Sequence, residues 1–170
     1  MHEQPPVIIE PYDPSWPLKF EAEKSALASA LSPWLAGPIE HVGSTAVPQL
    51  AAKAVIDIMA AVADLASSAA AIAALRPLSY CYFAYRADEM HWFCKPSDRK
   101  RTHHLHLVPF GSRLWNDRLA FRDLLRRDEA IRQAYAELKL ALAARHRNDR
   151  EAYTEAKSEF IRCALRRMRP

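Results

Sequence analysis

Glycine and cysteine are scarce in this sequence, and long apolar runs are missing from it. The chain has three glycines and three cysteines among 170 residues. Cys81, Cys94 and Cys163 are odd in number and widely spaced, which disfavours a disulfide framework. Residues 1–6 show no basic segment leading into an apolar one, and no apolar run approaches the roughly 20 residues of a membrane span. We therefore expect a cytoplasmic protein with reduced thiols, no signal peptide and no membrane partner.

The length and composition are those of one globular domain, residues 1–170. Half of the residues are hydrophobic and 26% are charged, and a chain of this length can bury a core without a disulfide or a metal ion. The net charge of +4 fits an ordinary basic surface, or attraction to a nucleotide or another phosphorylated small molecule. Nucleic acid is not expected as a partner, and assembly into a homo-oligomer is left open.

Hydrophobic periodicity predicts a helix, then strands with one helix among them, then a helical C-terminal part. Helices are expected over residues 17–31 and 65–75, from residue 114 onward, and again after Asp149. Strands are expected over residues 39–42, 55–62 and 104–109, with a hairpin over 80–85 and 90–94 and a basic loop over 95–102. This order favours an α/β (α+β) fold with a mixed sheet and flanking helices.

Asp57 interrupts an otherwise apolar segment, residues 54–60. A carboxylate buried in such a strand requires compensation by hydrogen bonds, a cation or a metal ion. The alternative is that Asp57 faces solvent from a strand covered on one side only. Because apolar residues flank it on both sides, we interpret Asp57 as a metal-binding or catalytic carboxylate.

Gly43 and Ser44 follow the strand that ends near His41 and Val42. A strand that ends in Gly-Ser can expose backbone N–H groups, and these groups with the hydroxyls of Ser44 and Thr45 can hold phosphate oxygens. An ordinary turn is the competing interpretation. With only three glycines in the chain, a glycine placed shortly before an intrastrand aspartate makes the pair more informative than either residue alone.

Histidines gather on the strand near residue 104. Strand alternation places His104 and His106 on one face, where His106 beside Asp57 is a candidate metal ligand or phosphate donor. Two exposed histidines are the alternative. A rival zinc set would add His91, Cys94 and His103 to His106, but we predict no structural zinc there, because alternation puts His91 and Cys94 on opposite faces.

Several basic and aromatic residues could line the same ligand site. Lys53 precedes Asp57 and either contacts phosphate or lies in solvent at the strand end. His41, at the end of its strand, is also a candidate. The helical part carries further candidates, which are Arg122, Lys139, Tyr153 and Lys157. They form either a basic wall for the ligand or a set of packed aromatic rings beside surface charges.

The Gly-Ser segment followed by a carboxylate on the next strand resembles the pattern of the nucleotidyltransferase superfamily. More closely, the chain resembles the GrpB family over almost its whole length. The matching segments are residues 11–16 (PYDPSW), 40–48 (EHVGSTAVP), 53–58 (KAVIDI), 104–108 (HLHLV), 121–123 (FRD) and 153–157 (YTEAK). This resemblance implies a nucleotidyltransferase-like fold in which Gly43 and Ser44 hold nucleotide phosphates and Asp57 holds Mg²⁺ or Mn²⁺ for attack on the α-phosphate.

The chain departs from these patterns at four positions. Active nucleotidyltransferases commonly carry a second carboxylate where this chain has Met59, and His106 is the nearest counterpart of a third. Gln49 and Ala54 stand where GrpB proteins usually have glycine and proline. Two hypotheses follow: a metal-dependent nucleotidyltransferase with an unknown acceptor, or a catalytically weak or inactive accessory module that keeps the phosphate cradle.

Overall fold

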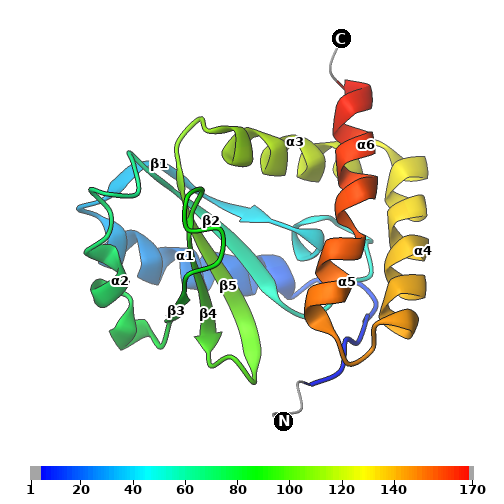
Figure 1. Cartoon of the computed structure of the whole chain (residues 1–170), viewed down its shortest axis with the longest axis horizontal. Coiled ribbons are helices and arrows are strands. Elements are labelled where there is room, and N and C mark those ends of the chain that lie inside the picture. Colours follow the sequence, from blue (N-terminus) through cyan, green and yellow to red (C-terminus); the bar gives the residue numbers. More distant parts are fainter. Residues whose placement is uncertain (1–4, 169–170) are drawn as a thin grey trace.

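A five-stranded mixed sheet forms the centre of the computed structural model, which describes residues 5–168 (Figure 1). Most of the segment that suggested the absence of a signal peptide, residues 1–4, lies outside the described residues. The strands are β1 (Leu35–Val42), β2 (Ile56–Val62), β3 (Cys81–Phe83), β4 (His91–Pro96) and β5 (Arg101–Pro109), in the spatial order β1-β2-β5-β4-β3. Only β2 and β5 pair in parallel; the other neighbours are antiparallel. The expected mixed sheet is confirmed.

Helices lie on both faces of this sheet and continue into a C-terminal group. They are α1 (Trp16–Leu31), α2 (Ala71–Ala74), α3 (Arg113–Arg127), α4 (Glu129–Arg145), α5 (Arg150–Ala156) and α6 (Ser158–Met168), with short 3₁₀ turns η1 (Ser44–Ala46) and η2 (Arg76–Leu78). In Figure 1, α1 crosses one face of the sheet, and α4, α5 and α6 stand together at the side opposite α2. No helix within residues 5–168 is long and apolar enough to cross a membrane.

The two faces of the sheet contribute to different hydrophobic clusters. Ile56, Ile58 and Leu105 alternate toward α1, where they pack with Phe20 and Leu27 in the main core. The intervening positions of the same strands point the other way, because side chains alternate along a strand. They include a second apolar cluster against α3 and, at one end of the sheet, Asp57 and two histidines. Both faces of β2 are therefore covered, as the apolar run around Asp57 predicted.

The second expected helix is much shorter than its alanine-rich sequence suggested. Regular α-helix is confined to Ala71–Ala74, and the preceding residues form successive i→i+3 turns. Asp64 does cap this segment, since its carboxylate accepts from the backbone N–H of Ser67. The hydroxyl of Ser68 donates to the carbonyl of Asp64, so serine side chains occupy groups that an α-helix would use.

Two other boundaries differ from the expectation. The loop expected over residues 95–102 is shorter, because β4 reaches Pro96 and β5 begins at Arg101. The single helix expected after Asp149 is two helices, α5 and α6, joined near Lys157. The side chain of Asp149 accepts from the N–H of Ala152, so the predicted cap is confirmed.

Candidate functional site

Asp57 lies next to Gly43, where β1 ends beside β2. Val42 pairs with Asp57 across the antiparallel ladder, and Gly43 follows with φ of 72°. A Cβ atom built on Gly43 would lie 2.5 Å from Oδ2 of Asp57, closer than any real contact of this kind. Glycine is therefore required twice here, by the positive φ and by the approach of the carboxylate.

Two histidines of β5 face the carboxylate of Asp57. His104 is its direct partner in the parallel register, and Nδ1 of His104 lies 2.9 Å from Oδ1 of Asp57. Nε2 of His106 lies 3.7 Å from the same oxygen. Burial acts to raise the pKa of Asp57, but its interactions with the two histidines hold that pKa well below the usual value. Asp57 is thus an anion whose side chain is 29% exposed, on an otherwise buried strand.

His106 is a buried, uncharged imidazole. Burial is the main cause that lowers its pKa to about 3, and the nearby Arg118 lowers it further against the opposing effect of Asp57. Its Nδ1 lies 3.3 Å from Sδ of Met90, and its Nε2 has no hydrogen-bond partner among residues 5–168. One ligand atom each from Asp57, His104 and His106 lie within 4.8 Å of one another, as the donors of a metal site do.

Cations surround this face of the sheet. We call Lys53, Arg101, Arg150 and Lys157 the basic cluster. Burial lowers the pKa of Lys53, as do the charges of Arg150 and Arg101, while Asp57 opposes the shift. Burial lowers the pKa of Lys157 to about 8, and repulsion by Lys53 contributes in the same direction. The basic cluster is consequently a place where an anion would be stabilised.

Aromatic rings hold these cations in place. The ammonium groups of Lys53 and Lys157 lie 5.8 and 4.2 Å from the ring centre of Tyr153, which is buried. The guanidinium of Arg101 lies 5.1 Å from the ring of Trp92, and the ring of His104 lies 5.2 Å from the same ring between centres. Trp92 belongs to the core and links the basic cluster to the Asp57 face.

Three of the predicted phosphate contacts have different surroundings. Gly43 is exposed and Ser44 half-buried beside the phenol of Tyr135, so both remain accessible at the end of β1. Thr45 is fully buried, and its hydroxyl donates to the carbonyl of Val55, which ties η1 to the chain before β2. Its hydroxyl is therefore occupied in the structure. The helix η1 has only three residues, too few for a helix dipole to attract an anion.

Lys139 is also occupied within the fold. It is 1% exposed, and its ammonium donates to the carbonyl of Ala51. Burial lowers its pKa to about 7, with a contribution from Lys157. The structure thus places this predicted ligand residue beneath the basic cluster, where it supports the chain entering β2.

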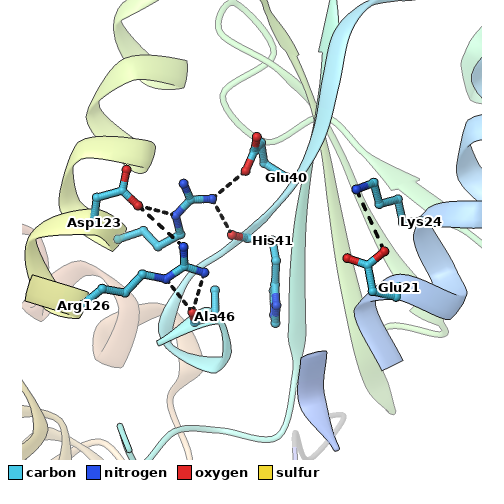
Figure 2. Close-up of polar contacts among 8 residues, drawn as sticks. Glu21, Lys24, Glu40, His41, Ala46, Asp123 and Arg126 are labelled. Carbon is cyan, nitrogen blue, oxygen red and sulfur yellow. Dashed lines mark hydrogen bonds and ion pairs between the residues drawn. The ribbon is translucent and has the colours of Figure 1, made fainter. Parts of the chain in front are cut away.

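The structure separates His41 and Arg122 from the Asp57 face. His41 points to the opposite face of β1, where its ring stacks on Phe20 with centres 4.8 Å apart. Arg122 donates to Glu40 at 2.6 Å and to the carbonyl of His41 at 3.0 Å. Figure 2 shows this network, in which Arg126 of α3 also reaches the carbonyl of Ala46. A hollow of about 710 Å³ opens here, between α1, the β1 edge and α3.

The rival zinc set does not converge on one point. His91 lies on the face covered by α2, where its Nε2 is 2.9 Å from the carbonyl of Leu65. Cys94 belongs to the cluster on the opposite face, with Trp92 and Met59. The predicted alternation of His91 and Cys94 is confirmed, and the same alternation separates His103 from His104 and His106.

Sequence reasoning did not identify three arginines near Asp57. Arg118 of α3 opposes the protonation of His106, and Arg101 and Arg150 belong to the basic cluster. Arg118 follows the buried Trp115 by about one helical turn, a spacing that indicates the face of α3 turned toward the sheet. Arg101 lies in the segment expected as a basic loop, but no local pattern indicates that it approaches Arg150. The two residues come together only through the packing of β5 and α5.

Comparisons with known proteins agree on one family. Residues 6–167 match the model of the GrpB protein family. A UPF0157 protein of Pseudomonas aeruginosa is 41% identical over 161 residues, which cover 91% of this chain and 64% of that protein. This chain thus spans a little less than two thirds of that relative. The crystal structure of the conserved protein GrpB from Enterococcus faecalis superposes with a TM-score of 0.83 at 31% identity, over 95% of this chain and 99% of that one.

A more distant match carries the name of an enzyme. A dephospho-CoA kinase of Mycolicibacterium paratuberculosis is 28% identical over 187 residues, which cover 95% of this chain and 46% of that protein. The similarity therefore concerns less than half of the kinase.

Proposed function

The chain belongs to the GrpB family, and we propose that it binds a phosphorylated small molecule, in the first instance a nucleotide, together with a divalent metal ion at the Asp57 face of the sheet. The observation that carries this proposal is the convergence of two complementary sites. A carboxylate with two histidines suits a cation, and the basic cluster beside it suits an anion. A metal ion with a bound phosphate would join the two.

The anion would lie between β1, the segment before β2 and α5. Lys53 and Lys157 approach the ring of Tyr153, and both carry pKa values lowered by burial and by neighbouring positive charge. A bound phosphate would relieve their repulsion by supplying negative charge. Gly43 and Ser44 would offer a backbone N–H and a hydroxyl at the accessible end of β1.

The metal ion, expected from the sequence to be Mg²⁺ or Mn²⁺, would lie against Asp57. Asp57 supplies an anionic oxygen and His106 a neutral nitrogen. Met59, at the position of the second carboxylate in active nucleotidyltransferases, is fully buried in the cluster under α3. We therefore propose that transfer of a nucleotidyl group to an acceptor is slow, with Asp57 as its catalytic residue.

The second candidate function is an accessory module that holds the ligand without reacting. Met59 favours this function, because methionine replaces the second carboxylate there. A site with one carboxylate neutralises less positive charge than a site with several. The match to part of a kinase fits a module of either kind. Turnover separates the two functions, since both require the ligand to bind.

Calorimetry with a nucleoside triphosphate, with Mn²⁺ or Mg²⁺ and without metal, tests the proposal. We expect tighter binding with metal, and loss of the metal-dependent part in Asp57→Asn. Lys157→Met should weaken binding about 10–100-fold, as expected for one lost hydrogen bond to a charged group. Lys24→Met is the matched control, because Lys24 lines the hollow between α1, the β1 edge and α3, away from the Asp57 face. Absence of nucleotide binding by the wild type, or equal effects of both lysine variants, would contradict the proposed site.

A further inference from the structure

We infer that Asp57, His104 and His106 form a three-ligand site for a first-row transition metal ion, and that this site prefers such an ion over magnesium. The inference deepens the metal part of the proposed function and does not depend on the nucleotide. It adds His104 as a ligand and assigns the class of metal. The supporting observations are the spacing of the three donors, an unpartnered buried nitrogen and the chemistry of the ligand set.

The donor spacing fits one ion. Two ligands that each lie roughly 2.1 Å from a metal ion stand about 3.0–3.5 Å apart at octahedral or tetrahedral angles. Oδ1 of Asp57 lies 2.9 Å from Nδ1 of His104 and 3.7 Å from Nε2 of His106. Both distances are close to that range. The parallel pairing of β2 with β5 sets them, because it aligns Asp57 with His104 and places His106 two residues further along the same face.

Nε2 of His106 is directed at this point. It is buried, has no hydrogen-bond partner among residues 5–168 and lies 3.7 Å from the anionic Oδ1 of Asp57. Sδ of Met90, 3.3 Å from Nδ1, can accept a hydrogen bond but cannot donate one. The tautomer that carries its proton on Nδ1 makes this hydrogen bond and leaves the lone pair of Nε2 facing the carboxylate. In this tautomer a cation between the nitrogen and the oxygen would be stabilised by both.

His104 joins the set by a change of tautomer. In the metal-free protein its Nδ1–H donates to Asp57, while its Nε2 is buried without a partner within the described chain. When a metal ion binds, the proton on Nδ1 is exchanged for one on Nε2, so the ring stays neutral and no electron is transferred. Nδ1 then offers its lone pair to the ion that Asp57 also binds.

The ligand chemistry decides which ion is preferred. Two imidazole nitrogens and one carboxylate oxygen suit Mn²⁺, Fe²⁺, Co²⁺ or Zn²⁺, whereas magnesium favours a shell of oxygen atoms and keeps several waters. Three protein ligands also leave positions on the ion open, as in catalytic rather than structural metal sites. The basic cluster lies near that side, so an anionic ligand would be drawn toward the open positions.

Titration with Co²⁺ alone tests the inference on the full chain after treatment with a chelator. We expect one Co²⁺ per chain, with a visible ligand-field absorption band and displacement by Zn²⁺ but not by an excess of Mg²⁺. His104→Asn and His106→Asn should each weaken Co²⁺ binding by at least about 10–100-fold, because the loss of a direct ligand costs no less than the loss of a partner that orients one. Asp57→Asn should abolish the band.

His103→Asn is the matched control, since His103 lies on the same strand but on its opposite face. Wild-type protein without a Co²⁺ band, equal competition by Mg²⁺, or an equal loss in His103→Asn would each overturn the inference. The Mg²⁺ competition uses the wild type only, so it decides the metal class even if a variant fails to fold. The titration contains no nucleotide. Cobalt binding without nucleotide binding would therefore refute the proposed function alone. Nucleotide binding without cobalt binding would refute this inference alone.

Discussion

At the scale of single residues, Gly43 and Gly111 share a positive φ but not a neighbourhood. Their φ angles are 72° and 73°. A Cβ atom on Gly43 would collide with Asp57, whereas a Cβ on Gly111 would meet no described atom within 4 Å. Substitution of the two glycines therefore compares a positive φ in open space with a positive φ next to the carboxylate of Asp57.

Gly111→Ala should destabilise the fold by about 1 kcal/mol through backbone strain. Gly43→Ala should cost about 1–3 kcal/mol more, because Asp57 must also move, and it should abolish Co²⁺ binding. Urea denaturation and the cobalt titration measure both effects. Equal destabilisation of the two variants with unchanged metal binding would show that Gly43 does not shape the carboxylate site.

Lys139 is a second residue whose burial has a measurable consequence. Its pKa is lowered from an ordinary value of 10.5 to about 7, mainly by burial. Between these two values the unfolded chain holds a proton that the folded chain has released. The free energy of unfolding therefore rises with pH between about 7 and 10.5, and the burial of the charged lysine costs most below pH 7.

Lys139→Met should remove this contribution, which amounts to at most about 1.4 kcal/mol per pH unit. Urea denaturation of both proteins between pH 7 and 9.5 would show a smaller rise of stability with pH in the variant. Parallel pH dependences would mean that the Lys139 ammonium keeps its proton, held by the carbonyl of Ala51.

At the scale of elements, a buried polar contact joins α1 to strand β4 and to Tyr80. Glu23 of α1 accepts a hydrogen bond of 2.9 Å from the hydroxyl of Tyr80. It also pairs with the ammonium of Lys95 of β4 at 2.6 and 2.7 Å. Because Glu23 is buried, removal of its charge would leave Lys95 with an incomplete partner in a poorly solvated place.

Glu23→Gln should therefore destabilise the protein by about 2–4 kcal/mol, a little below the range for fully buried pairs, since Lys95 is partly exposed. Glu21→Gln on the same helix is the control, with an expected effect below about 1 kcal/mol because its pair with Lys24 is exposed. Chemical denaturation compares them, and similar losses would argue against a special role for the contact.

At the scale of the whole molecule, the helical C-terminal part contributes to the basic cluster beside the sheet. Lys157 and Tyr153 come from the α5 region, more than half the chain away from Gly43, and approach Lys53. The pKa of Lys157, lowered to about 8 by burial and by Lys53, reports this approach. A bound anion would raise that pKa, because it favours the charged form.

If the proposed function holds, binding of inorganic triphosphate at pH 8 should take up on the order of half a proton at Lys157. Calorimetry in buffers with different ionisation enthalpies measures the uptake as a change in the apparent binding enthalpy. Lys157→Met should bind more weakly and lose most of the buffer dependence. Binding with the same enthalpy in every buffer would place the anion away from Lys157.

Features that depend on local periodicity could be predicted from the sequence alone. Alternation along a strand put His104 and His106 on one face, and the apolar run around Asp57 indicated a strand covered on both sides. The mixed sheet and the helical C-terminal part followed from the order of such segments. These predictions succeeded because each one depends on residues within a few positions of one another.

The contacts between residues far apart in the sequence depend on the packing of the whole fold. The parallel register that aligns Asp57 with His104 depends on a crossover through β3 and β4, and no local pattern specifies it. The antiparallel pairing of β1 with β2 divided the candidates, since it places His41 beside Ile58 on the face toward α1, while Asp57 faces the basic cluster. Arg101 and Lys157 reach this face through the packing of β5 and α5. Strand pairing and helix packing are long-range choices set by the whole core, and for that reason the chemistry of single residues did not reveal them.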